Sequence, residues 1–376
     1  MSSKQIDFLY LSEEDIKVAG VLNMKRCVEV IDEMFQLMGS GDYLMGGPKQ
    51  NDHGLMIWFP EEQLGPRMPV TGPDRRFLSL ISYLGGRFHV CGNKWYGSNI
   101  ENAQIGLPRS VLTITLNDPD TSAPLAFMSG NLVSAMRTGA VPGVAAKYLA
   151  NREASIVGLV GAGVINRACM LAICETMPQI KEVVIFDLNK EKAAVLAQEI
   201  KDLYGVQGIV ADNIKECVEG ADIISVATSG HIKPQIKDEW LKKGALLALT
   251  GAAELSDETY KKHRVVVDNW KMHKAWLRDA KEHPDGIKSI VDWAMTGQLL
   301  KLVNEGNFDS GQVTDLGEVA LNQKCRSNIN DNQETTIFLT GGLPIEDLAW
   351  GYEIYQNALK QGIGQKLNLW QEPHWS

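Results

Sequence analysis

A glycine-rich turn between an apolar run and a helical segment constrains the fold of this chain more than any other feature. The apolar run spans residues 156–160, and Gly161-Ala162-Gly163 follows it directly. Glycines let the backbone turn tightly and approach a pyrophosphate, whose charge then lies at the N-terminus of the next helix. Asp187 ends the following apolar run, where a carboxylate can accept hydrogen bonds from both ribose hydroxyls and repel a 2′-phosphate. The pattern predicts a site for NAD, with NADP disfavoured, although Asn166 stands where a third glycine is usual.

Apolar runs rich in β-branched residues recur through the middle of the chain. They lie at residues 183–186, 223–226, 245–249 and 265–267. Segments of helical composition, such as residues 190–203, lie between them. Continuous apolar strands that alternate with helices indicate a parallel sheet that is covered on both faces. We therefore expect an α/β fold, with a Rossmann doubly wound parallel sheet in a domain that spans residues 139–319.

The N-terminal part of the chain has a different pattern. Ser12 and Asp15 form a capping signature at the start of a first helix. A second amphipathic helix is expected after Asn23, because its apolar residues recur with helical spacing. Residues 50–128 are rich in glycine, proline and short strand-like runs, which indicates a mostly antiparallel sheet.

The C-terminal segment lacks the alternation of strands and helices that marks the middle. Residues 344–359 are expected to form an amphipathic helix that stops near Gly362 and folds back onto the N-terminal part. The two ends together predict an α+β domain for substrate binding and dimerisation. It spans residues 1–138 and is completed by about 320–376.

Composition excludes several classes of protein. The net charge of −9 argues against a nucleic-acid partner, which needs a basic face to neutralise phosphates. No run of 18 apolar residues occurs, and the first residues lack an apolar signal core, so no membrane span or export is expected. Six cysteines without a C-x-x-C pair suggest reduced thiols and a cytoplasmic location. No cluster of histidines and carboxylates suggests a metal.

Two basic residues outside the glycine-rich turn are candidate ligands for a substrate. Arg137 is expected at a helix start beside Thr138, where its guanidinium can bind a carboxylate or phosphate through two parallel hydrogen bonds. Lys94 is flanked by aromatic residues and glycines. Taken alone, such an arginine is more often part of a surface salt bridge, and a lysine is usually solvated.

Several motifs together resemble the signature of the ornithine cyclodeaminase/mu-crystallin family. They are Arg137-Thr138-Gly139-Ala140 with residues 144–150, Gly161-Ala162-Gly163, Lys94 with Asn102, Asp315-Leu316-Gly317-Glu318, residues 340–347 and residues 358–364. The likeness extends from about residue 8 to residue 366. It implies a Rossmann domain beside a substrate domain that both chain ends build, and a homodimer.

The resemblance also implies an activity and a set of site residues. Family members oxidise an amino acid to an imine or reduce an imine with NAD(P)(H), and the cyclodeaminases close a ring and expel ammonia. By position, Lys94 and Arg137 are expected to bind the substrate, with Lys94 also able to assist proton transfer. The residues expected at the cofactor are Arg137, Thr138, Gly161, Gly163, Val164, Ile165, Asp187, Thr228, Gly251 and Thr340, and Gly341 is expected among the substrate ligands.

Two departures from the family's pattern affect the expected chemistry. The family's cyclodeaminases carry an acidic residue after the fifth strand, and here that acid is either replaced by Ala253 or supplied by Glu254. The family's first substrate arginine corresponds to Lys49, which offers a point charge in place of a planar fork. Because a cyclodeaminase needs the acid to handle water and the amine, both departures argue against ordinary ornithine chemistry.

Three functions are compatible with this pattern. The leading hypothesis is an NAD-dependent amino-acid dehydrogenase or imine reductase, which takes a small amino acid or imine as its substrate. The second is an ornithine cyclodeaminase-type ammonia-lyase that recycles NAD and uses Glu254 as the acid. The third is a non-catalytic binding protein like mu-crystallin. The presence of Lys94 and Arg137 favours an enzyme over the third hypothesis.

Overall fold

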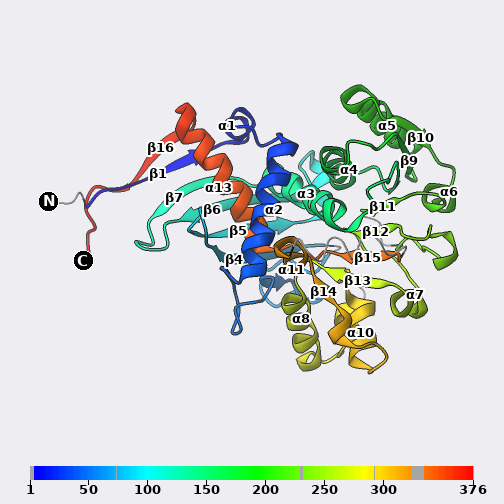
Figure 1. Cartoon of the computed structure of the whole chain (residues 1–376). Helices are drawn as coiled ribbons and strands as arrows, with labels where there is room; N and C mark the ends of the chain where they lie inside the picture. The colour runs from blue at the N-terminus through cyan, green and yellow to red at the C-terminus, as the bar shows by residue number, and fades with distance from the viewer. Residues whose placement is uncertain (1–3, 73, 229–231, 292, 323–333, 376) are drawn as a thin grey trace. The chain divides into compact units, whose positions relative to one another are not determined.

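The computed structural model describes residues 4–72, 74–228, 232–291, 293–322 and 334–375. The chain divides into two compact units. Unit 1 comprises Met1–Asn23, Asp42–Ser134 and Leu343–Ser376, and unit 2 comprises Met24–Gly41 and Ala135–Gly342. Figure 1 shows the elements of both units coloured along the chain.

Unit 2 is built on an eight-stranded sheet in which every neighbouring pair of strands is parallel. The order across the sheet is β10-β9-β8-β11-β12-β15-β13-β14. The strands are β8 (Ile156–Val160), β9 (Glu182–Phe186), β10 (Gln207–Val210), β11 (Ile223–Val226), β12 (Leu246–Leu249), β13 (Arg264–Val267), β14 (Thr314–Asp315) and β15 (Thr336–Leu339). The order reverses between β8 and β11, as it does in a doubly wound sheet.

Helices flank this sheet (Figure 1). They are α2 (Met24–Ser40), α3 (Asn131–Leu149, which starts in unit 1), α4 (Val164–Thr176), α5 (Lys190–Tyr204), α6 (Ile214–Val218), α7 (Asp257–Lys262), α8 (Trp270–Glu282), α9 (Lys288–Val291), α10 (Gly297–Asn304) and α11 (Leu316–Leu321), with short 3-10 turns at Asp238–Trp240 and Ser310–Gln312. The predicted α/β fold with a Rossmann sheet is confirmed. The apolar runs expected to be strands form β8, β9, β11, β12 and β13.

Glycines in α3 allow that helix to approach α4 closely. A Cβ atom added at Gly139 would lie 2.3 Å from the Cβ of Ala168, and one added at Gly143 would lie 2.6 Å from the Cβ of Ala172. Only a hydrogen at each position leaves room for the facing helix. The glycine of the Arg137-Thr138-Gly139 motif therefore has a packing role.

Unit 1 contains a second sheet, in which the order is β16-β1-β7-β6-β5-β4-β2 and β3 pairs with β4. Its strands are β1 (Ile6–Leu11), β2 (Tyr43–Met45), β3 (Leu55–Trp58), β4 (Arg76–Leu84), β5 (Val90–Ser98), β6 (Ser110–Asn117), β7 (Pro124–Ser129) and β16 (Gln365–Trp370). Every pair is antiparallel except β1 with β7. The mostly antiparallel sheet expected over residues 50–128 is therefore present.

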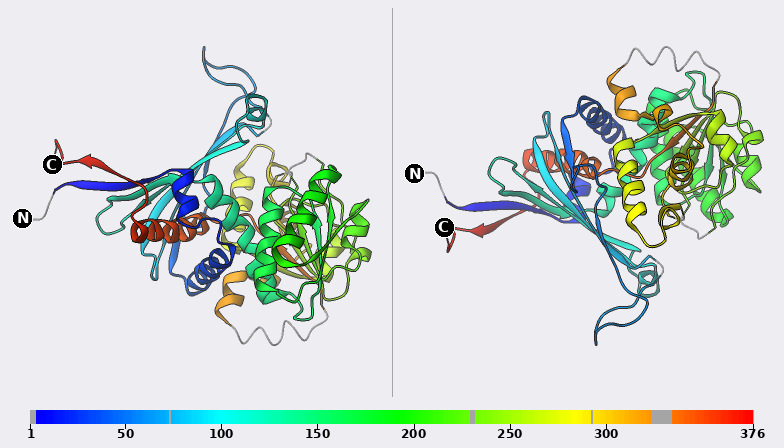
Figure 2. Two further views of the ribbon diagram at one scale, coloured as in Figure 1. Left: turned by 90° about the horizontal axis from the view of Figure 1, so that it is seen from above. Right: turned by 90° about the horizontal axis from the view of Figure 1, so that it is seen from below.

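Three helical segments accompany this sheet: α1 (Glu13–Val18), a 3-10 helix (Ile100–Ile105) and α13 (Pro344–Gln361). The expected capping box is present at α1, where Ser12 and Asp15 bond reciprocally. The C-terminal helix ends at Gly362, which has a φ of 66°. It lies along the sheet (Figures 1 and 2), with Leu348 beside Gly92 of β5. The C-terminal segment thus folds onto the N-terminal part, as expected.

The bounds of the two units differ from the expected domain bounds in three places. Residues 135–138 lie in unit 2, whose second segment begins at Ala135. Residues 24–41 lie in unit 2, because α2 packs against α11 at a close approach of Gly39 and Gly317. Residues 320–322 and 334–342 also lie in unit 2, because β15 is an internal strand of the parallel sheet. Apolar periodicity shows that these segments have a buried face but does not show which sheet or helix covers it.

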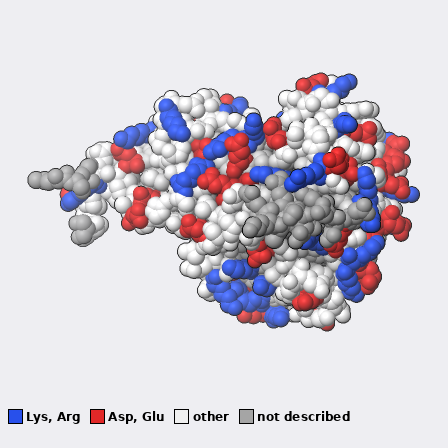
Figure 3. All heavy atoms as spheres, in the orientation of Figure 1, with Lys and Arg blue, Asp and Glu red and all other residues white. Residues whose placement is uncertain are grey.

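Within the described ranges, no helix is both long enough and apolar enough to cross a membrane. The five cysteines among the described residues carry reduced thiols, and Cys325 lies outside the described residues. On the face shown in Figure 3, basic and acidic side chains are interspersed.

Candidate functional site

The carboxyl edge of the parallel sheet in unit 2 gathers five of the ten residues expected to bind a cofactor. Each of them follows the last residue of a strand by one or two positions. They are Gly161 after β8, Asp187 after β9, Thr228 after β11, Gly251 after β12 and Thr340 after β15. In open parallel sheets, ligands bind outside this edge near the point where the strand order reverses. Here that point lies between β8 and β11.

The Gly161-Ala162-Gly163 turn leaves the N-terminus of α4 open. Gly161 has a φ of +99°, and a Cβ atom there would lie 2.6 Å from the carbonyl oxygen of Ala227. Gly163 is the N-cap of α4, has no side chain to bond the first amides, and has open space where a Cβ would stand. Val164 at the start of the helix is exposed, and Ile165 is half-buried. Exposed amides at the positive end of a helix dipole suit a phosphate group.

Asn166 occupies the place of the usual third glycine and is fully buried. Its amide nitrogen donates to the carbonyls of Val160 and Gly161 at 3.0 and 2.7 Å. Its amide oxygen accepts from the hydroxyl of Ser225 at 2.6 Å. The side chain therefore joins β8, the glycine turn and β11, and the departure at this position preserves the shape of the turn. The sequence pattern alone does not predict this role.

Asp187 lies beside the same turn. Its Oδ2 accepts from the amide of Ala162 at 2.7 Å, and its Oδ1 accepts from the amide of Asn189 at 2.8 Å. A surface pocket of about 410 Å³ adjoins it. The pocket is lined by Ala162, Arg167, Asn189, Glu191, Lys192, Val195, Leu196 and Glu199. A carboxylate held at the rim of such a pocket can accept hydrogen bonds from sugar hydroxyls.

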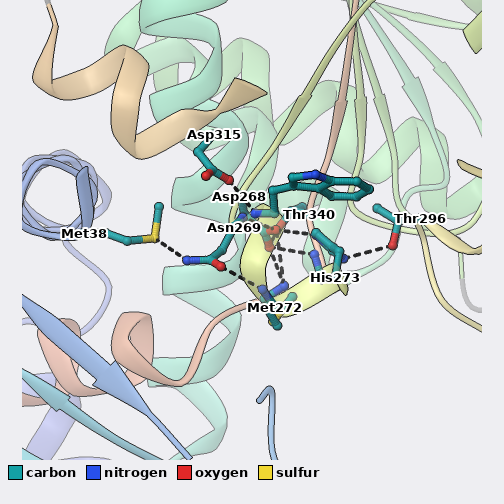
Figure 4. Close-up of polar contacts among 11 residues, drawn as sticks. Met38, Asp268, Asn269, Met272, His273, Thr296, Asp315 and Thr340 are labelled. Atoms are coloured by element: carbon teal, nitrogen blue, oxygen red, sulfur yellow. Dashed lines mark hydrogen bonds and ion pairs between the residues drawn. The ribbon is translucent and has the colours of Figure 1, made fainter. Parts of the chain in front are cut away.

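A buried carboxylate, Asp268, holds the loop that follows β15. Its Oδ2 accepts from the hydroxyl of Thr340 at 2.9 Å and from the amides of Gly341 and Gly342 at 2.7 and 3.0 Å (Figure 4). Burial alone would raise the pKa of Asp268, but the neighbouring His273 and these hydrogen bonds outweigh it, so the pKa is lowered. Asp268 therefore binds the loop as an ionised carboxylate.

The other oxygen of Asp268 is bound by α8. The amide of Asn269 donates to Oδ1 at 2.7 Å, and Nε2 of His273 lies 2.7 Å from it. Because an ionised carboxylate only accepts, Nε2 carries the proton of this hydrogen bond. On the other side of the ring, Nδ1 lies 2.9 Å from the hydroxyl of Thr296. His273 therefore belongs to a fully buried polar network with Asp268 and Thr296.

Arg137 lies in the interior of α3, not at its start as the sequence suggested, because the helix begins at Asn131. The side chain is only 6% exposed. A Cβ atom added at Gly342 would lie 2.9 Å from Nη1 of Arg137, so the guanidinium reaches the loop that Asp268 holds. Thr138 beside it is half-buried. The guanidinium of Arg137 thus lies at the end of that loop, where its planar set of donors can bind a carboxylate through two hydrogen bonds.

In unit 1, Lys94 of β5 is 2% exposed, although a lysine is usually solvated. Its Nζ donates to Oδ2 of Asp347 at 2.6 Å and to the hydroxyl of Ser134 at 3.4 Å. Asp347 is fully buried in the first turn of α13. Burial of a charged amine requires such a partner. The motif at residues 340–347 contained this partner, but no role was assigned to Asp347 from the sequence.

Two expected site residues lie at the surface of their units. Lys49 is exposed in the turn between Gly46 and Asp52, which form a β-bridge. Glu254 is also exposed, and its backbone pairs with Gln235 in a second β-bridge. Asn102 donates its side-chain amide to the carbonyl of Pro108 at 3.0 Å and supports a loop of unit 1.

The described parts of the chain contain no group of three histidine, cysteine or carboxylate side chains that could hold a metal ion. The residues at the carboxyl edge of unit 2 fit a dinucleotide instead, since they offer an open helix N-terminus, a glycine turn and a carboxylate beside a pocket. Arg137 adds an anion-binding group at the other end of this edge. Such an arrangement can bind a dinucleotide and a small carboxylate.

Comparisons with known proteins agree with this geometry. The family model of the "Ornithine cyclodeaminase/mu-crystallin family" matches residues 21–362. The N-((2S)-2-amino-2-carboxyethyl)-L-glutamate dehydrogenase of Staphylococcus aureus is 27% identical over 97% of this chain and 99% of its own length. The Delta(1)-pyrroline-2-carboxylate reductase of Bacillus cereus is 30% identical over 72% of this chain and 78% of its own length.

A solved structure is similar over nearly the whole chain. It is that of Thermococcus litoralis Delta(1)-pyrroline-2-carboxylate reductase in complex with NADH and L-proline. The TM-score is 0.76 at 28% sequence identity, and the match covers 96% of this chain and 100% of that one.

Proposed function

The chain belongs to the ornithine cyclodeaminase/mu-crystallin family, and we propose that it is an NAD-dependent oxidoreductase that interconverts an amino acid and its imine. The similar proteins named above include a dehydrogenase of an amino-acid derivative and a reductase of a cyclic imino acid. The solved relative holds NADH together with L-proline. A nicotinamide cofactor and a carboxylate-bearing amine or imine are therefore the proposed ligands of this chain.

The observation that carries the proposal is the position of Arg137 within unit 2. Its guanidinium is buried at the loop that follows β15, on the edge of the sheet where the glycine turn offers its open helix N-terminus. A buried arginine fork binds a planar carboxylate through two hydrogen bonds. We assign the dinucleotide to the glycine turn and Asp187, and the substrate carboxylate to Arg137.

The reaction requires a hydride and a proton. A nicotinamide cofactor held by the glycine turn and Asp187 would supply or accept the hydride at the α-carbon of the substrate. Lys94 is the proposed proton partner of the substrate nitrogen, because its ammonium is buried and oriented by the carboxylate of Asp347 at 2.6 Å. A positioned acid or base of this kind contributes roughly 10²–10⁴-fold to a rate.

A cyclodeaminase is the second candidate, and it needs an acid near the reacting carbon. Glu254 is the residue that sequence position offers for this role, but its side chain is exposed and its backbone is tied to residue 235. Ala253 cannot carry a proton. The structure of this segment therefore favours hydride transfer without that acid.

A turnover panel tests the proposal. The purified chain is incubated with NADH and Δ1-pyrroline-2-carboxylate, or with α-keto acids and ammonia, and then with NAD and amino acids, while absorbance of the reduced cofactor is followed. We expect net consumption of NADH with at least one imine. Conversion of ornithine to proline without net change in the cofactor would instead show a cyclodeaminase.

Paired variants identify the proton partner. Lys94→Ala should reduce turnover at least about 100-fold, since it removes the acid, whereas Glu254→Gln should change turnover less than about threefold. Ala253→Asp is the complementary variant, because a gain of ornithine cyclisation would indicate a lost cyclodeaminase site. A severe defect in Glu254→Gln with normal NADH binding would overturn the assignment of the proton to Lys94.

The proposed assembly is a homodimer, and the proposed location is the cytoplasm. Exposed apolar side chains gather on β3 of unit 1, where Leu55, Ile57 and Trp58 are 74%, 54% and 50% exposed. Such a patch is typical of a protein–protein interface. Sedimentation equilibrium of the chain should give twice the monomer mass, and Ile57→Asp should shift the mass toward the monomer.

A further inference from the structure

We propose that His273 is a positioning residue, which acts through Asp268 to hold the loop of residues 340–342 where the chain binds its dinucleotide and substrate. The inference rests on the proposed function, and on the expectation from the family resemblance that Thr340 contacts the cofactor and Gly341 contacts the substrate. It comes from a chain of buried polar contacts within unit 2 (Figure 4).

The first link is the side of Asp268 that faces the loop. A single oxygen, Oδ2, accepts from the Thr340 hydroxyl and from the amides of Gly341 and Gly342. Asp268 is fully buried, so water cannot replace it as the acceptor of these three donors. Displacement of the loop would leave all three donors without this partner, and each such loss is costly in a buried site.

The second link is the side of Asp268 that faces α8. His273 is the side chain that donates to Oδ1, beside the backbone amide of Asn269. Its ring is oriented in turn by the hydroxyl of Thr296, and all three side chains, Asp268, His273 and Thr296, are fully buried. His273 therefore fixes both the charge and the rotation of the carboxylate that the loop depends on.

The loop is also closely packed between α8 and Arg137. A Cβ atom at Gly341 would lie 2.6 Å from the ring of Trp276 and 3.2 Å from Cε1 of His273. A Cβ atom at Gly342 would lie 2.9 Å from Nη1 of Arg137. A shift of the loop away from Asp268 would therefore move the backbone that adjoins the proposed carboxylate ligand. His273 touches neither ligand in this account and acts through Asp268.

A matched pair of polar variants tests the inference. His273→Gln places an amide near the position of Nε2 and keeps a donor for Asp268, whereas His273→Asn places its amide near Nδ1 and loses that donor. The dissociation constant of NADH is measured by its fluorescence, and the melting temperature is measured in parallel. We expect His273→Asn to weaken NADH binding about tenfold or more and His273→Gln to weaken it less than about threefold.

Steady-state kinetics separate positioning from chemistry. His273→Asn should raise the KM for the imine and for NADH more than it lowers kcat, because the displaced loop impairs binding. An exposed histidine of the same unit, changed as His283→Gln, is the control and should resemble the parent chain. Parental NADH affinity in His273→Asn, or equal weakening in the glutamine and asparagine variants, would overturn the inference.

Thr296→Val provides a milder test if the asparagine variant does not fold. It removes only the contact to Nδ1, so NADH binding should weaken about threefold, and unchanged affinity would contradict the proposal. The NADH titration needs no turnover. Failure of the turnover panel with a parent chain that binds NADH would therefore count against the proposed function alone.

Discussion

At the scale of single residues, Asp187 has the clearest consequence for ligand choice. Its carboxylate is held by the amides of Ala162 and Asn189, so its charge is fixed beside the pocket next to the glycine turn. A 2′-phosphate at this place would face a like charge at short distance. The repulsion is on the order of 1–3 kcal/mol where solvent screens it in part.

We expect this chain to bind NADH more tightly than NADPH by about tenfold or more, as the repulsion implies. Asp187→Ser should reduce the difference in affinity between NADH and NADPH, because serine removes the charge and keeps a hydrogen-bonding group. Fluorescence titration of both cofactors against both proteins measures the effect. Equal affinity of the parent chain for NADH and NADPH would contradict the role of Asp187.

Arg137 should matter more for the substrate than for the cofactor. Loss of one bidentate, charge-assisted interaction between an arginine and a carboxylate costs about 2–5 kcal/mol when the opposite charge stays buried. Arg137→Ala should therefore raise the KM for the imine at least about 30-fold or abolish turnover, while the NADH titration stays nearly normal. Arg152, which is exposed shortly after the same helix, offers the matched control as Arg152→Ala. Unchanged kinetics in Arg137→Ala would show that its role is structural.

At the scale of elements, replacement by alanine is expected to have opposite effects on stability at two helix glycines. Ala is favoured over Gly in a helix by about 1 kcal/mol. At Gly139 this gain is smaller than the cost of overlap, because the new Cβ would lie 2.3 Å from the Cβ of Ala168. At Gly351 of α13 the nearest atom would lie at 3.6 Å, an ordinary contact distance.

Gly139→Ala should lower the melting temperature by several degrees, since overpacking a helix contact costs about 1–3 kcal/mol. Gly351→Ala should leave it unchanged or raise it. Calorimetry of the two variants beside the parent chain measures the contrast. A stable Gly139→Ala variant would show that α3 can move away from α4 without cost.

The helices and strands could be predicted from the sequence better than the elements that lie beside them in the fold. Strands such as β8 and β9 are continuous apolar runs, and a capping box marks α1, so local chemistry identifies them. The place of β15 between β12 and β13 depends on contacts across the chain, which no local pattern encodes. The start of α3 was missed for a related reason, since Asn131 begins the helix while its side chain bonds Ser110 and Leu112 of β6.

The same distinction applies to the candidate site. The proximity of Asp187 to the Gly161-Ala162-Gly163 turn could be predicted, because both follow neighbouring strands of the expected parallel sheet. The pairing of Lys94 with Asp347 joins residues 253 positions apart, so the residue type alone predicted a solvated lysine. Asp268 could have been found by its place directly after the strand run 265–267, but nothing local shows that it binds the loop after β15.

At the scale of the whole molecule, Asp315 links stability to pH. Burial raises the pKa of this carboxyl from 3.8 to about 6, although its hydrogen bond from the Trp270 amide acts in the opposite direction. A carboxyl with a raised pKa binds more protons in the folded state than in the unfolded state between these values. Its contribution to stability is therefore present below pH 4 and is lost as pH rises through about 6.

Asp315→Asn should remove this dependence, since asparagine keeps an acceptor for the Trp270 amide and carries no charge. Near pH 4 the variant and the parent chain should have similar free energies of unfolding, because the aspartate is then protonated in the folded state. At pH 7 the variant should be more stable by up to about 3 kcal/mol, the equivalent of a two-unit rise in pKa. Urea unfolding of both proteins at pH 4, 5, 6 and 7 measures the difference directly. A difference that stays constant across this range would mean that Asp315 ionises equally well in the folded and unfolded chain.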